Sequence, residues 1–78
     1  MRKGQLAIVC KVWTEAVLLL GVLDRRGFIF NGFKGQESWD GDDTTYVINQ
    51  RSKRVECVTK QQAEEAGCKI AYCKELYR

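Results

Sequence analysis

The stretch that decides the fold is AVLLLGVL, residues 16–23, the longest uninterrupted apolar run in the chain. An apolar run of this length fits either a buried strand or a short helix capped by Thr14. Its length favours the strand, and so does Gly21, which costs a helix about 1 kcal/mol relative to Ala. The sequence Asp24-Arg25-Arg26-Gly27 that follows is typical of a hairpin turn. We therefore predict a strand over 16–23 and keep a helix over 14–22 as the alternative.

The segments on either side of this run have strand character. Residues 5–13 alternate in side-chain type and are rich in β-branched residues, which predicts a first strand. Residues 28–33 contain three aromatic residues, two before the turn-forming pair Asn31-Gly32 and one after it. This composition predicts the second arm of the hairpin. Residues 34–43 collect Gly, Asp and Ser around Trp39 and predict a long acidic loop.

A second hairpin is predicted from residues 44–49 and 54–59. Both runs are rich in strand-forming residues, and 50–53 separate them as a turn. Placing Tyr46 and Ile48 opposite Val55 and Cys57 gives suitable cross-strand partners.

A short helix follows near residues 60–66. Thr59 and Gln62 have the spacing of a capping box, and Gly67 is well placed to end the helix in a left-handed conformation. Alternation resumes over residues 68–76 and predicts a closing strand.

This order of elements resembles small barrels of the Src-homology type. The resemblance implies a mainly β fold, either a small antiparallel barrel or a strongly bent sheet, with the one short helix near 60–66. A helix over 14–22 would give instead an α+β domain with that helix packed on an antiparallel sheet. A length of 78 residues predicts a single globular domain, 1–78. The architecture does not fix the function, because many unrelated activities share it.

Composition excludes several function classes. The chain is 45% hydrophobic and 29% charged, as expected of a globular protein. It contains no His, which excludes Ser-His-Asp and Cys-His catalysis and His-ligated metals. We therefore expect no catalytic residues and no enzyme activity. Residues 16–23 are too short to cross a bilayer, which needs about 20 apolar residues, so no membrane association is expected.

The four cysteines, Cys10, Cys57, Cys68 and Cys73, do not have zinc-site spacing, which is usually two close pairs. The segment Asp40-Gly41-Asp42-Asp43 lacks the twelve-residue pattern of a calcium loop. Neither a metal nor a cofactor is expected. Because the first residues lack the pattern of an export signal, we expect a cytoplasmic protein with free thiols.

Two candidate binding surfaces stand out. The first is the acidic loop, in which Trp39 could anchor a protein partner with charges beside it; its residues are Trp39, Asp40, Asp42 and Asp43. The alternative for Trp39 is that it folds back as the lid of a small core.

The second candidate surface is basic and lies at the two predicted hairpin tips. Its residues are Arg25, Arg26, Arg51, Lys53 and Arg54. If the tips lie at one end of the molecule, five cations converge and can neutralise phosphates, with Tyr46 or Phe33 available to stack on bases. The acidic loop would dilute this field.

These features predict a small non-catalytic interaction module. The expected partner is an unidentified protein, and the expected role is that of a regulator or inhibitor. Because the chain is so small, we expect it to be of the kind encoded by phages or mobile elements. Nucleic-acid binding through the basic residues is the alternative, in keeping with a modest net charge of +3. A homodimer is possible, because so short a chain buries only about 60 to 65% of its unfolded surface.

Overall fold

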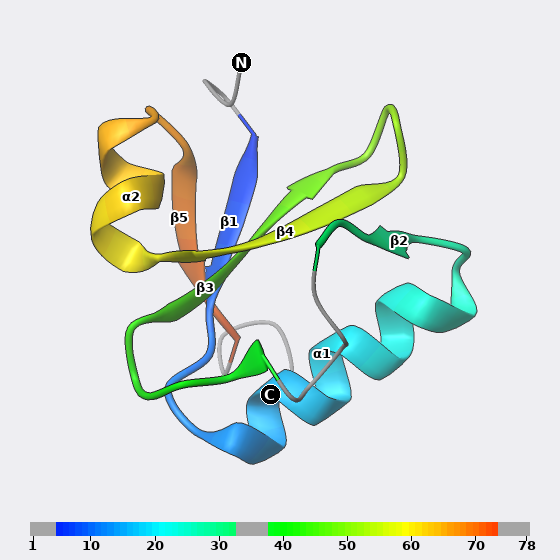
Figure 1. The fold of residues 1–78 in the computed structure, drawn as a ribbon, viewed down its shortest axis with the longest axis horizontal. Helices are drawn as coiled ribbons and strands as arrows, with labels where there is room; N and C mark the ends of the chain where they lie inside the picture. The colour runs from blue at the N-terminus through cyan, green and yellow to red at the C-terminus, as the bar shows by residue number, and fades with distance from the viewer. Residues whose placement is uncertain (1–4, 33–37, 74–78) are drawn as a thin grey trace.

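The computed structural model describes residues 5–32 and 38–73. They form a five-stranded sheet and two helices (Figure 1). In chain order these are β1 (Leu6–Val9), α1 (Trp13–Arg25), β2 (Ile29–Phe30), β3 (Thr44–Asn49), β4 (Arg54–Thr59), α2 (Lys60–Glu65) and β5 (Lys69–Tyr72). The strand order across the sheet is β2-β4-β3-β1-β5.

The sheet is open and mixed, so the domain is α+β. β3 pairs antiparallel with β1 and β4, whereas β5 runs parallel to β1 and β2 parallel to β4. With β2 at one edge and β5 at the other, the described strands do not close into a barrel. The alternative α+β architecture is the better description, although its sheet is mixed and not purely antiparallel.

The predicted strand over 16–23 is wrong, because these residues lie in α1. Ala16, Leu19, Leu20 and Leu23 are all buried, and their spacing of three, four and seven residues is that of one helix face. Gly21 lies where an added Cβ would meet nothing within 4 Å. Burial of the three leucines offsets the low helix propensity of this glycine, since each buried leucine contributes about 1.5–3 kcal/mol.

The ends of α1 also differ from the prediction. The N-cap is Val12, without a side-chain cap, and the Lys11 N–H donates to the Glu15 carboxylate at 2.9 Å; Thr14 is not the cap. The predicted hairpin turn at 24–27 is instead the C-terminus of α1. Gly27 has φ +85°. The Gly27 N–H donates to the Asp24 carbonyl, and the Phe28 N–H donates to the Leu23 carbonyl. A glycine here allows the left-handed residue that commonly ends a helix.

The second hairpin and the short helix are confirmed. β3 and β4 have the predicted bounds, and their register pairs Tyr46 with Cys57 and Ile48 with Val55. α2 begins with a capping box in which the Thr59 hydroxyl accepts from the Gln62 N–H at 3.1 Å.

The remaining strands are shorter than predicted. β1 occupies four residues of the predicted 5–13, and β5 four residues of the predicted 68–76, of which 74–76 lie outside the described residues. Of the predicted hairpin arm over 28–33, residue 33 lies outside the described residues; within 28–32 the strand is limited to the two residues of β2, which pair with β4 because the segment before them is a helix and not a strand.

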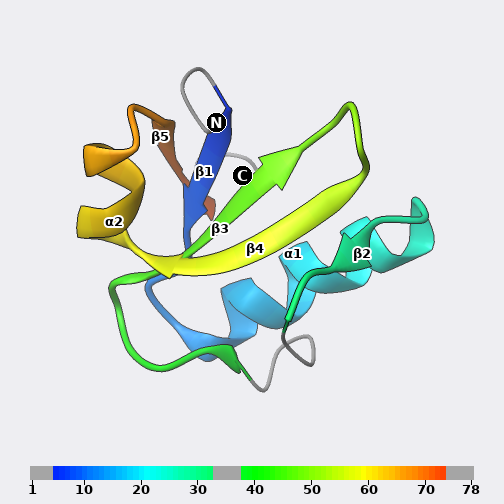
Figure 2. The same ribbon diagram turned by 45° about the horizontal axis from the view of Figure 1, so that its top comes forward.

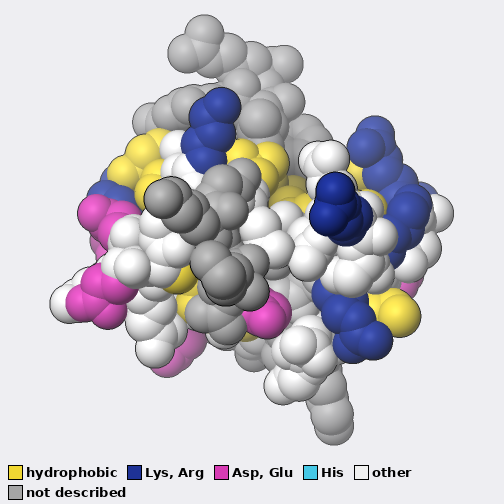
Figure 3. Space-filling view, turned by 90° about the horizontal axis from the view of Figure 1, so that it is seen from above, with side chains coloured by type: hydrophobic (Ala, Val, Ile, Leu, Met, Phe, Trp, Pro, Cys, Tyr) yellow, Lys and Arg dark blue, Asp and Glu magenta, His cyan; other side chains and the backbone are white. Residues whose placement is uncertain are grey.

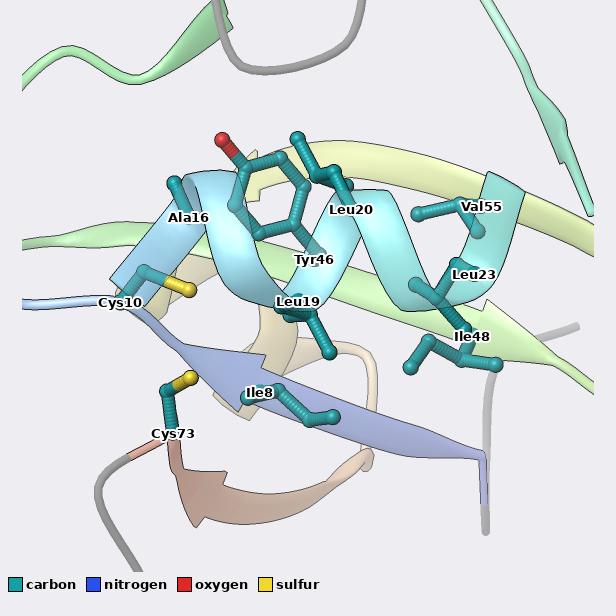
Figure 4. Packing of buried hydrophobic residues seen from close by; sticks show 10 residues of the cluster. All are labelled: Ile8, Cys10, Ala16, Leu19, Leu20, Leu23, Tyr46, Ile48, Val55 and Cys73. Carbon is teal, nitrogen blue, oxygen red and sulfur yellow. The ribbon is translucent and has the colours of Figure 1, made fainter. Parts of the chain in front are cut away.

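The core lies on both faces of the sheet. The larger cluster packs α1 against side chains of β1, β3 and β4, with Tyr46 at its centre (Figure 4). On the opposite face, Ala63 of α2 packs against Ala7 and Val47. Successive side chains of a strand point to opposite faces of the sheet. Ile8, Tyr46 and Ile48 therefore face α1, whereas Ala7 and Val47 face α2. Figure 2 shows α1 and α2 well apart on either side of the strands. Neither helix of the described residues is long and apolar enough to cross a membrane.

Candidate nucleic-acid interface

The structure brings the two predicted groups of cations to one end of the molecule. The C-terminus of α1 lies beside the β3–β4 turn, because the Lys53 ammonium donates to the Arg26 carbonyl at 3.4 Å. The Ile29 N–H also donates to the Lys53 carbonyl at 2.8 Å. We call this surface the basic end; its residues, all exposed, are Arg25, Arg26, Arg51, Lys53 and Arg54.

Local chemistry explains why each group of cations is held at this end. Arg25 lies in the last turn of α1, where a cation interacts favourably with the helix dipole. In the β3–β4 turn, the Asn49 side-chain oxygen accepts from the N–H groups of Arg51 and Ser52, at 3.0 and 3.2 Å. This local bonding orders the turn without using the basic side chains.

Charges of opposite sign occupy opposite ends of the β3–β4 hairpin. Asp40, Asp42 and Asp43 are exposed just before β3, whereas the basic turn follows it. Six residues of strand separate the two by about 17 Å, roughly twice the Debye length in physiological salt. Figure 3 shows dark blue side chains gathered on the right, the side of the β3–β4 turn. The acidic loop therefore dilutes the basic field less than its nearness in sequence suggests.

Apolar groups adjoin the basic end. The Lys53 ammonium lies 5.4 Å from the centroid of the Phe28 ring, and the neighbouring Ile29 is 55% exposed. Next to them, an open groove of about 270 Å³ runs between α1 and the sheet. Its lining includes Arg26 and Phe28 together with Leu6, Ile8, Leu19, Val22, Leu23 and Ile48. Sequence reasoning missed this groove because it depends on residues 16–23 being a helix.

The aromatic residues predicted to stack on bases are not available there. Tyr46 has no exposed surface, and its hydroxyl is hydrogen-bonded to the Ser38 hydroxyl at 3.0 Å. Burial raises the pKa of Tyr46 to about 12. Phe33 lies outside the described residues. Phe28 is the aromatic residue that the fold places beside the cations.

Trp39 lies against the core as a lid. Its indole Nε1–H donates to the Cys10 carbonyl at 2.8 Å, and its ring packs on the larger core cluster. This position matches the alternative considered for Trp39 in the sequence. Asp40, Asp42 and Asp43 are exposed beside it, with the Asp40 N–H bonded to the Thr44 hydroxyl at 2.9 Å.

The cysteines have the environment of buried thiols. Burial raises the pKa of the Cys10, Cys57 and Cys73 thiols, so the thiol and not the nucleophilic thiolate is favoured at neutral pH. Within residues 5–32 and 38–73, no group of three or more Cys, Asp or Glu side chains is arranged to hold a metal ion.

Comparison of the chain with protein-family models, with curated proteins and with solved structures found no match.

Proposed function

We propose that this chain is a non-catalytic protein that binds single-stranded nucleic acid, with the basic end as its binding surface. The observation that carries the proposal is the bond between Lys53 and the Arg26 carbonyl, which joins two groups of cations from separate parts of the chain. Neither group alone is dense enough to argue for phosphate binding in a chain with a net charge of +3.

Phosphate neutralisation would supply most of the affinity. Each phosphate contacted by Lys or Arg releases counterions, so binding weakens steeply as salt rises. The five side chains of the basic end are exposed and therefore accessible to a nucleic-acid backbone. The aspartates of the acidic loop lie more than one Debye length away along the hairpin, so they oppose this attraction only weakly.

The apolar groups beside the basic end favour a single strand over a duplex. Bases of a single strand are unstacked and can lie on an aromatic or apolar surface, whereas a duplex hides them. Phe28, Ile29 and the groove next to them offer such a surface close to Arg26.

The proposal is tested by fluorescence anisotropy with labelled single-stranded and duplex oligonucleotides of mixed sequence at several salt concentrations. We expect tighter binding to the single strand and a log–log salt slope of about −2 to −3.5, as for three to five phosphate contacts at about 0.7 each. A slope near zero, or no binding at low salt, would contradict the proposal.

Charge-neutralising variants locate the surface. Arg51→Gln should weaken binding and lower the salt slope by about one contact, because its side chain takes no part in ordering the turn. The matched control is Lys69→Gln, which removes an exposed cation from β5 at the opposite edge of the sheet. An equal loss of affinity in the two variants would mean that binding depends on the net charge of the chain and not on the basic end.

A second candidate function is protein binding, through the first half of α1 and not through Trp39. Val12, Trp13 and Leu18 are 49%, 52% and 57% exposed, although residues of this size and type are usually buried. Tryptophan is prominent among residues that dominate interface energetics. A second copy of the chain is the partner that we assign to this surface, because so small a domain gains by covering apolar side chains.

Sedimentation over a range of concentrations tests this second function. Self-association should disappear in Leu18→Lys, whose exposed position tolerates the charge, and persist in Lys69→Gln. A wild-type chain that stays monomeric at high concentration would refute it, without bearing on nucleic-acid binding.

A further inference from the structure

Cys10 and Cys73 lie side by side although they are far apart in the sequence. Each directly follows the last residue of a strand: Cys10 follows β1 and Cys73 follows β5. These strands are parallel neighbours in which Val9 is opposite Tyr72, so Cys10 and Cys73 leave the sheet next to each other at the same ends of the two strands. Neighbouring strands are about 4.8 Å apart, which lies within the Cα separation of about 4.4–6.8 Å that a disulfide requires.

The two side chains enter the same part of the core. Cys10 is 0% exposed and Cys73 is 1% exposed, and both belong to the cluster beneath α1. Figure 4 shows their sulfur atoms on the same side of the strands. The Cys73 thiol donates to the Glu15 carbonyl at 3.5 Å, and burial together with the nearby Cys73 thiol raises the pKa of Cys10.

We propose that Cys10 and Cys73 are the site of an oxidative modification, a disulfide formed by exchange with a low-molecular-weight disulfide such as oxidised glutathione. In the first step one thiolate attacks glutathione disulfide, giving a mixed disulfide and one reduced glutathione. In the second step the other cysteine displaces a second reduced glutathione and closes the protein disulfide. The two protons of the protein thiols pass to the two departing glutathione thiolates, and the two electrons lost by the protein thiols reduce the glutathione disulfide.

Access to the buried thiols is through the edge of the sheet. β5 is an edge strand of four residues, paired on one side with β1 alone. Such elements open locally at a lower free energy than global unfolding. The exchange is therefore slow in the native chain and limited by opening of β5.

The other two cysteines do not share this geometry. The Cys57 thiol donates to the Ser38 carbonyl at 3.9 Å, from β4, which β3 separates from β1. Cys68 packs with the smaller cluster on the opposite face of the sheet. Pairing of Cys10 with Cys73 is thus selected by the fold and not by sequence spacing.

The bond would tie the end of β5 to the segment between β1 and α1. Residues 11–72 lie between the two cysteines, so the cross-link closes most of the chain into one loop. For a loop of about 60 residues, the equilibrium constant for forming the disulfide is higher in the folded chain than in the unfolded chain by up to about 10³-fold.

The test equilibrates the full-length protein with mixtures of reduced and oxidised glutathione, both folded and in urea. Acid quenching, alkylation and peptide mapping by mass spectrometry follow. We expect a product lighter by two hydrogens, a cross-linked peptide that joins Cys10 to Cys73, and an equilibrium constant at least about tenfold higher in the folded chain than in urea.

Two variants keep the result interpretable. The double variant Cys57→Ser/Cys68→Ser should cross-link as the wild type does, and Cys73→Ser should give no internal cross-link. Persistent glutathione adducts at Cys10 or Cys73, dominance of any other cysteine pair, no oxidation of the folded chain, or a folded-to-unfolded ratio below about tenfold would each overturn the proposal.

Discussion

Replacement of Gly21 by alanine should stabilise the protein, because Gly21 is inside α1 and has room for a methyl group. An ideal Cβ at this position meets nothing within 4 Å, so the substitution costs no packing. Alanine exceeds glycine in helix propensity by about 0.8–1.0 kcal/mol. The free energy of unfolding should rise by that amount, and the melting temperature by about 4–8 °C for a domain of this size.

Gly27→Ala is the matched control and should have the opposite sign. An added Cβ at Gly27 also meets nothing within 4 Å, but the residue has φ +85°. A left-handed conformation costs a residue with a side chain about 1–2 kcal/mol. The same chemical change should therefore stabilise the helix interior and destabilise the helix end.

Urea unfolding followed by far-ultraviolet circular dichroism, together with thermal melts, measures both variants. If Gly21→Ala were neutral or destabilising, residues 16–23 would not lie in a helix with an open outer side, and the assignment of the core to α1 would be refuted. A neutral Gly27→Ala would refute the helix end at 24–27.

Three further predictions concern stability. Trp39→Ala should lower the free energy of unfolding by about 2–3 kcal/mol in urea titrations, because the indole packs on the core and bonds to a buried carbonyl; an unchanged midpoint would return Trp39 to the interface. Thr59→Ala should cost about 1 kcal/mol through loss of the capping box, whereas Thr14→Ala, which removes no cap, should cost less than half of that in the same assay. Because burial raises the pKa of Tyr46 to about 12, this residue contributes stability below pH 10 that is lost as pH rises toward 12; Tyr46→Phe should flatten that decline in unfolding free energies measured from pH 9 to 12.

The basic end and the thiol pair lie in different parts of the fold and can be tested separately. The basic end is formed by the C-terminus of α1 and the β3–β4 turn, whereas Cys10 and Cys73 lie near the N-terminus of α1. Oxidation of the thiols is therefore expected to leave nucleic-acid binding unchanged in the anisotropy assay. Loss of binding on oxidation would indicate that α1 moves as a unit.

The sequence alone determined the elements whose signals are local. The bounds of the β3–β4 hairpin are predicted by the sequence because alternating strand residues flank a short polar turn. The short helix α2 was predicted because a capping box and a terminal glycine both act within a few residues. Where hydrogen bonds and side-chain pairing are made between near neighbours, the sequence contains the whole interaction.

The tertiary structure alone decided the rest. The apolar run of residues 16–23 fits a strand and a helix equally well. The helix forms because one face of the sheet buries Leu19, Leu20 and Leu23 together. That choice then places Arg26 beside Lys53 and creates the groove next to them. It also leaves β1 free to pair with β5, which brings Cys10 to Cys73. These contacts join residues distant in the sequence, and only packing of the whole chain determines which of them form.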